Sequence, residues 1–168
     1  PAAVNPWVSS NPLVATINNS GLVSGVSTGT TTITYTNSNG CQITATVTIN
    51  GLPAITGTLN ACVGLTTQLS GTGSPAAVNP WVSSNPLVAT INNSGLVTGV
   101  SAGTTTITYT NSNGCQITAT ITINGLPAIT GTLNACIGLT TQLSGTGSPA
   151  AVNPWVSSNP LIATITSS

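Results

Sequence analysis

The chain has 168 residues and contains no Lys, Arg, Asp, Glu or His, so its formal net charge is zero. Acid–base catalysis relies on His, carboxylates or Lys, calcium sites need carboxylate oxygens, and nucleic-acid binding needs Lys and Arg. We therefore expect no enzyme activity, no metal, no other cofactor and no nucleic-acid partner. No run of 18 apolar residues occurs, so we expect no membrane insertion in this segment.

A repeat of 74 residues organises the chain, because the sequence PAAVNPWVSSNPL begins at Pro1, Pro75 and Pro149. Residues 1–94 and 75–168 differ at only seven positions, three of which exchange Val for Ile. The motif Asn-Gly-Leu-Pro at 50–53 and 124–127 separates a partial domain (1–51), a complete domain (52–125) and a second partial domain (126–168). Such short joints are not flexible linkers. Both ends fall inside a repeat unit, so we expect a segment of a longer protein.

The complete unit has a hydrophobic period of two, which is typical of half-buried strands. In chain order, strands are predicted at 54–58, 65–69, 81–83, 87–91, 96–100, 104–110 and 115–124. Asn92-Asn93-Ser94-Gly95 and Asn111-Ser112-Asn113-Gly114 have the composition of hairpin turns. No segment has a helical period. We therefore predict an all-β fold, with about seven short strands per repeat forming a two-sheet antiparallel sandwich.

Residues 81–110, WVSSNPLVATINNSGLVTGVSAGTTTITYT, resemble the bacterial immunoglobulin-like domain of the group-2 type. This family occurs in intimin- and invasin-like surface proteins. The pair CVG and NGC, with the Thr-rich last strand, resembles tandem repeats of giant secreted surface proteins of gliding Bacteroidota. The resemblance implies tandem immunoglobulin-like β-sandwich domains in an extracellular or cell-surface adhesin. Members of the family usually carry charged residues, and this chain departs from them in having none.

The four cysteines occur two to a repeat, which is too few for a four-thiolate zinc site. In a secreted chain, disulfides are the default. We predict a Cys62–Cys115 disulfide, worth about 4 kcal/mol on the loop-entropy model, and we expect Cys41 and Cys136 to have partners outside this chain. One alternative stays open: Cys62 near the top of its strand and Cys115 near the bottom of its own would favour cross-links between neighbouring chains.

One tryptophan recurs in each repeat, at Trp7, Trp81 and Trp155. A lone Trp on the third strand of a sandwich is usually an anchor of the core, and we predict that role for all three. A solvent-facing indole that stacks on a sugar is the alternative. No second aromatic residue supports a binding platform, since we expect Tyr35 and Tyr109 in the core or at an edge.

Threonines alternate along two strands that a hairpin makes neighbours, which predicts rows of hydroxyls on one outward face. The rows comprise Thr104, Thr106 and Thr108 on one strand and Thr118, Thr120 and Thr122 on the other. Regular Thr arrays can order water, so an ice- or carbohydrate-binding surface is one interpretation. The other is that Thr forms strands well and keeps an uncharged protein soluble.

These observations favour a structural role over the alternatives. We expect a rigid, inert stalk of a surface adhesin, or a filament assembled by self-association, because an uncharged surface lacks the repulsion that keeps proteins apart. The alternative is a carbohydrate- or ice-binding module that uses the neutral Thr and Asn surface. A glycan partner has no support beyond that surface.

Overall fold

The computed structural model describes residues 5–166, and it is all-β there. The chain divides into two compact units, residues 1–124 and 125–168. Pro1, which opens the first copy of the repeat, and Ser167, one of the positions that differ between copies, lie outside the described residues. No helix in the described part has the length and hydropathy needed to cross a bilayer.

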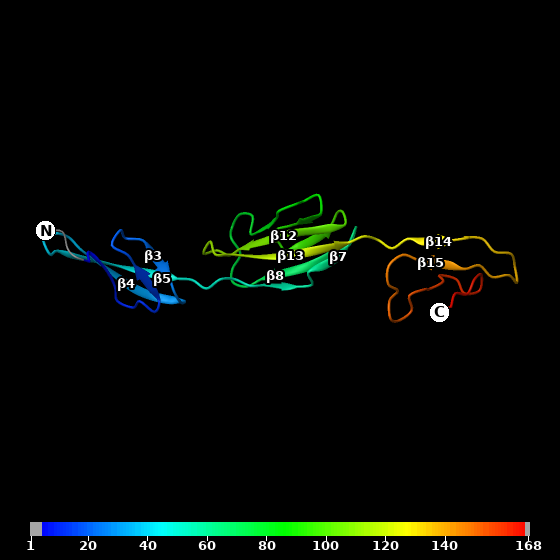
Figure 1. Ribbon diagram of the computed structural model, residues 1–168, viewed down its shortest axis with the longest axis horizontal. Helices are drawn as coiled ribbons and strands as arrows, with labels where there is room; N and C mark the ends of the chain where they lie inside the picture. Colours follow the sequence, from blue (N-terminus) through cyan, green and yellow to red (C-terminus); the bar gives the residue numbers. More distant parts are fainter. Residues whose placement is uncertain (1–4, 167–168) are drawn as a thin grey trace. The chain divides into compact units, whose positions relative to one another are not determined.

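Residues 55–124 form two four-stranded sheets, because polar and apolar side chains alternate along their strands (Figure 1). One sheet has the order β10-β11-β8-β6 and is built from Ala89–Ile91, Leu96–Gly99, Thr66–Gly71 and Ile55–Gly57. The other has the order β7-β13-β12-β9 and is built from Asn60–Cys62, Gln116–Asn124, Gly103–Thr110 and Trp81–Ser83. The sandwich and its antiparallel pairing are confirmed, and the seven predicted strands end within two residues of the observed ones.

The prediction of about seven strands missed β7. This strand has the sequence Asn-Ala-Cys, which is too short to alternate, and it pairs parallel to β13, with Cys62 opposite Asn124. Every other pairing in the repeat is antiparallel. β7 therefore completes the second sheet at an edge that no local sequence pattern marks.

The core lies between the two sheets and takes side chains from both. Its buried members are Leu69, Trp81, Ala89, Val97, Ile107, Tyr109, Ile121 and Ile123. Trp81 is 6% exposed, and its ring centroid lies 4.5 Å from that of Tyr109 at a tilt of 41°. The Tyr109 hydroxyl donates a hydrogen bond to the Gly73 carbonyl at 3.1 Å. The two aromatic residues, which are neighbours in the second sheet, thus pack on each other, and the Tyr109 hydroxyl bonds the segment that follows β8 of the first sheet.

One buried hydroxyl fixes the segment that follows Trp81. Oγ1 of Thr105, which is 4% exposed, accepts a hydrogen bond from the Asn85 backbone N–H at 3.0 Å. The same atom lies 3.2 Å from Oγ of Ser83 and 3.1 Å from Oγ of Ser84. Thr31 repeats this arrangement with Ser9, Ser10 and Asn11. The Ser-Ser-Asn sequence after each of these tryptophans is therefore part of a hydrogen-bonded cluster.

We expect Thr105→Val to lower the free energy of unfolding by about 1–3 kcal/mol, because it removes a buried hydroxyl that makes three hydrogen bonds at once. Urea unfolding of the full chain measures the change. Thr106→Val is the matched control, because its side chain points to the opposite face of β12 and should change stability by less than about 0.5 kcal/mol. Equal losses in the two variants would contradict the role assigned to Thr105.

The strands at either side of this repeat form separate sheets. Residues 7–49 contain β1 (Trp7–Ser9), β2 (Ala15–Ile17), β3 (Val23–Gly25), β4 (Gly29–Thr36) and β5 (Gln42–Ile49). Residues 129–145 contain β14 (Ile129–Gly131) and β15 (Leu143–Gly145). The registers of β4 with β5 and of β2 with β3 repeat those of β12 with β13 and of β10 with β11. Nearly identical sequences therefore form the same local pairings.

The complete repeat has two distinct ends. At the end that we call leading, Ala54 accepts a hydrogen bond from Thr72 N, and Ser112 N donates to the Ser74 carbonyl at 2.7 Å. At the other end, called trailing, β13 finishes at Asn124. The nine residues of β13 span about 30 Å. The chain therefore enters the repeat at one end and leaves it at the opposite end.

Candidate functional site

The outward face of β12 and β13 carries a regular set of threonines. Hydrogen-bonded registry places Thr104 opposite Thr122, Thr106 opposite Thr120, and Thr108 opposite Thr118. The alternation of each strand turns the intervening Thr105, Ile107 and Tyr109 into the core. The six predicted threonines are therefore neighbours on one side of the sheet, three on each strand.

The six hydroxyls form a grid with a spacing set by the sheet. Neighbouring strands lie about 4.8 Å apart, and residues two apart along a strand are separated by about 6.7 Å. Thr104, Thr118, Thr120 and Thr122 are exposed, whereas Thr106 and Thr108 are half-buried. Within the described part of the chain, none of the six side chains makes a hydrogen bond to another protein group. Their hydroxyls are therefore available to water or to a ligand.

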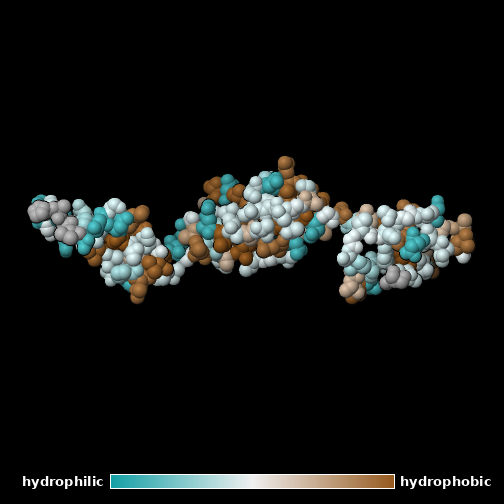
Figure 2. All heavy atoms as spheres, in the orientation of Figure 1, coloured by the Kyte–Doolittle hydropathy of each residue, from teal (hydrophilic) through white to brown (hydrophobic). Residues whose placement is uncertain are grey.

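The same grid occurs on β4 and β5. Thr30, Thr32 and Thr34 lie opposite Thr48, Thr46 and Thr44, in the order given. The surface of the complete repeat has mostly near-neutral hydropathy, with scattered hydrophobic side chains (Figure 2). Val82 of β9, which is 50% exposed, lies opposite Thr108 and ends the grid on that side. The grid is thus an uncharged surface that occurs on both strand pairs.

The aromatic residues do not form a ligand platform. A shallow depression of about 250 Å³ lies beside Trp81 and Tyr109, next to Gly71 and Ser94. Both rings belong to the core, and Tyr109 is only 2% exposed. Trp7 pairs with Tyr35 in the same way, at 4.5 Å and 42°, and Trp155 is half-buried. A sugar ring could not stack on the faces of the buried Trp81 and Tyr109.

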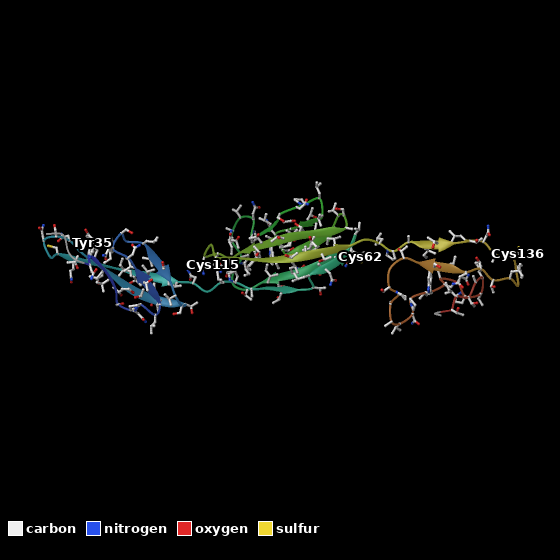
Figure 3. All side chains as sticks on the ribbon, viewed as in Figure 1. Tyr35, Cys62, Cys115 and Cys136 are labelled. Carbon is white, nitrogen blue, oxygen red and sulfur yellow. The ribbon has the colours of Figure 1, made fainter. Side chains whose placement is uncertain are left out.

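The predicted Cys62–Cys115 disulfide is wrong. Cys62 lies opposite Asn124 at the trailing end, whereas Cys115 precedes β13 at the leading end (Figure 3). The length of β13, about 30 Å, separates them, and bonded cysteines need Cα atoms within about 7 Å. All four cysteines are free thiols: Cys41 and Cys136 are exposed, and Cys62 and Cys115 are half-buried.

The described residues contain no group of three His, Cys, Asp or Glu side chains that could hold a metal ion. The cluster around Thr105 was not predicted from the sequence. Two features of the sequence could have indicated it. Thr105 occupies a position of its strand at which the alternation points the side chain into the core, and two serines follow closely after the core residue Trp81. Because its atoms satisfy one another, it is a structural element of the repeat and offers no group to a ligand.

The family profile described as bacterial Ig-like domain (group 2) matches residues 3–51 and 55–123. The chain belongs to this family. The two matched segments include all strands from β1 to β13 except the last residue of β13, Asn124, so the bacterial Ig-like fold accounts for the complete repeat and for the segment before it.

Comparison with curated proteins and solved structures gives more distant relatives. The chain is 35% identical over 136 residues to Ice-binding protein 1 of Shewanella frigidimarina (strain NCIMB 400), a match that covers 71% of this chain and 15% of that protein. The chain thus spans less than a sixth of that relative's length. A 282-residue C-terminal fragment of intimin, solved with the intimin-binding domain of the translocated intimin receptor, is 19% identical, with a TM-score of 0.44 over 74% of this chain and 52% of that one. Domains 4 and 5 of the S-layer protein SbsC are 21% identical, with a TM-score of 0.32 over 71% and 70%.

Proposed function

We propose that these bacterial Ig-like repeats are the structural stalk of an extracellular bacterial surface adhesin and act as a rigid, chemically inert spacer. The chain is extracellular or at the cell surface, in keeping with its family. The observation that carries the proposal is the path of the chain through the complete repeat, from Ala54 at the leading end to Asn124 at the trailing end. Because the chain enters such a domain at one end and leaves it at the other, each further domain joined in series makes the molecule longer.

The chemistry of the repeat supports the same role. Side chains from the eight strands of the repeat fill its core. Every buried side-chain polar atom in the described residues has a hydrogen-bond partner. The joints between repeats consist of Gly-Leu-Pro, as at 51–53 and 125–127, and are too short to be flexible linkers. A stalk needs nothing more from its repeats than length, stiffness and resistance to the medium.

Electron microscopy of the native material tests the proposal. Single, thin, beaded strands that project from the cell are the expected result for a stalk. Ordered fibres of several chains would instead indicate a filament, to which exposed strand edges and the absence of charge could contribute. Sedimentation at high protein concentration over a range of salt separates the two, because a strict monomer excludes lateral assembly. Compact particles would contradict both.

Uncharged repeats should be insensitive to pH. Without Asp, Glu, Lys, Arg or His, folding is coupled to almost no proton uptake or release. We expect the free energy of unfolding to change by less than about 1 kcal/mol between pH 4 and pH 8, measured by urea unfolding. A marked acid transition in that range would contradict this expectation.

A second candidate function is recognition of ice or carbohydrate by the threonine grid. The in-register Thr pairs favour it, and so does the similarity to a protein named for ice binding. An ice-shaping assay and a glycan array on the full chain test it. If the grid binds, Thr120→Lys in its centre abolishes the signal, whereas Thr90→Lys, an exposed threonine of β10 on the other sheet, leaves it unchanged. No signal from the unmodified chain would leave only the structural role.

A further inference from the structure

The dipeptide Asn-Gly occurs four times in the chain, at 39–40, 50–51, 113–114 and 124–125. In such a pair the glycine nitrogen can attack the side-chain amide of the asparagine, because glycine has no side chain to hinder the approach. The four pairs form two matched sets with identical neighbours, Ser-Asn-Gly-Cys and Ile-Asn-Gly-Leu. A difference in reactivity within a set must therefore come from the structure around each pair.

The two Ser-Asn-Gly-Cys pairs lie in hairpin turns, where the glycine N–H is already bonded. Gly114 N donates a hydrogen bond to the Asn111 carbonyl at 3.0 Å, and Asn113 N donates to Oδ1 of Asn111 at 3.0 Å. Gly40 N donates to the Asn37 carbonyl at 3.0 Å in the same way. The glycine nitrogen must lose its proton before it can attack. A carbonyl acceptor holds that proton in both turns, so the turns must open before either pair reacts.

The two Ile-Asn-Gly-Leu pairs lie at the joints, where the glycine N–H has no such partner. Asn50 and Asn124 are exposed, and Gly51 and Gly125 lie outside the strands and turns. Within the described part of the chain, neither glycine N–H donates a hydrogen bond to another protein group. The nitrogen of each glycine can therefore lose its proton to solvent without any opening of the backbone.

Strand β7 distinguishes the two joint asparagines. The Asn124 carbonyl accepts a hydrogen bond from Val63 N at 2.9 Å, and Nδ2 of Asn124 donates to the Ala61 carbonyl at 3.4 Å. β5, by contrast, is the edge strand of its sheet, and the side chain of Asn50 makes no hydrogen bond to any other described residue. The reaction turns the asparagine side chain toward the next nitrogen. At Asn124 that rotation must first break the pairing with the β7 segment.

We propose that the joint asparagines, Asn50 and Asn124, are sites of spontaneous deamidation, and that the turn asparagines, Asn39 and Asn113, are protected from it. The glycine nitrogen loses its proton and bonds to Cγ of the asparagine. The Cγ–Nδ2 bond breaks, and ammonia leaves with that proton, so a succinimide ring remains. Water then opens the ring at one of its two carbonyl groups and gives aspartate or isoaspartate. Water is the only other reactant, and nothing is oxidised or reduced.

The product places a formal charge on a chain that otherwise has none, because a carboxyl group is ionised at neutral pH. At Asn124, an oxygen would replace the Nδ2 donor beside the Ala61 carbonyl. Two acceptors repel each other, so the pairing of β7 with β13 should weaken. The inference concerns the chemistry of each joint by itself and does not depend on the proposed stalk.

Incubation of the full chain in mildly alkaline buffer, with a parallel sample in guanidinium chloride, tests the proposal. Peptic digestion and tandem mass spectrometry give the rate at each asparagine, because the Val and Ile exchanges between the copies give their peptides different masses. In the native chain we expect Asn50 to react first. Asn124 should react about tenfold more slowly, the factor that about 1.4 kcal/mol of opening free energy gives. The turn asparagines should be slower than Asn50 by at least about tenfold on the same argument.

In guanidinium chloride, Asn50 and Asn124 should react at the same rate, because their neighbours are identical and the strands are gone. A difference between them that persists there would overturn the inference. Equal rates at these two residues in the native chain, or a turn asparagine that reacts as fast as Asn50, would do the same.

Two matched variants assign the first charge that the native chain acquires. Asn50→Gln should abolish the early acidic species on anion exchange, because glutamine does not form the succinimide. Asn39→Gln is the control, since it changes an exposed turn residue before the same kind of glycine, and it should leave that species unchanged. An early species that survives in Asn50→Gln would contradict the assignment.

Discussion

Replacing Trp81 with Ala is expected to lower the free energy of unfolding of the complete Ig-like repeat by about 3–5 kcal/mol. The indole is 6% exposed, packs on Tyr109 and contributes to the core that both sheets share. Its loss would leave a cavity between the sheets that rigid strands cannot close. Small domains have a total stability of about 5–15 kcal/mol, so much of the population should lose its tertiary structure on mild heating.

Thermal unfolding of the full chain, followed by Trp fluorescence and circular dichroism, measures this loss. Val82→Ala is the matched control, since the neighbouring side chain on β9 points to solvent and is 50% exposed. It should cost less than about 1 kcal/mol, a magnitude typical of strand propensity alone. A loss for Trp81→Ala as small as that of the control would show that the indole is no core anchor.

Adding a single methyl group at Gly71 is expected to have an effect almost as large. A Cβ built on Gly71 would overlap the ring of Tyr109, and the ring is held by its hydrogen bond to the Gly73 carbonyl. Gly71→Ala must therefore push Tyr109 out of position. We expect a loss of about 2–4 kcal/mol, which combines overpacking with a weakened hydrogen bond.

The chain contains its own control for this substitution. Gly145 stands at the same place in β15, and there the nearest heavy atom to an added Cβ lies 3.5 Å away, on Trp155. Gly145→Ala should therefore change the free energy of unfolding of its own unit, residues 125–168, by less than about 0.5 kcal/mol. Urea unfolding of both variants measures the two changes in the free energy of unfolding. Equal effects would mean that the close approach of Gly71 to Tyr109 is not what constrains position 71.

The sequence was sufficient to predict the features that depend on local periodicity. The alternation of apolar residues and Thr in residues 104–110 and 115–124 predicted both strands, and the Asn-Ser-Asn-Gly turn predicted the hairpin and hence the pairing of the Thr rows. Period-two alternation and turn chemistry act over a few residues, so a single sequence displays them. The family pattern in residues 81–110 supplied the immunoglobulin-like fold on the same basis.

Features that depend on which strands become neighbours were not predictable in the same way. β7 has three residues and a parallel partner 62 positions along the chain, and no local pattern marks such a pairing. The wrong disulfide has the same origin, because the separation of Cys62 from Cys115 follows from where β7 lies along β13. The Thr105 cluster joins a strand to a loop 20 residues away. Each of these needs the topology before the residues can be interpreted.

The proposed stalk requires that the repeats add length in series. Small-angle X-ray scattering on arrays of two, three and four complete 74-residue repeats measures it directly. From the length of strands such as β13, about 30 Å, plus a joint, we predict that the maximum dimension of the array grows linearly, by about 35–40 Å for each added repeat. A radius of gyration that follows the scaling of a compact protein, with an exponent of about 0.38 in chain length, would contradict the claim.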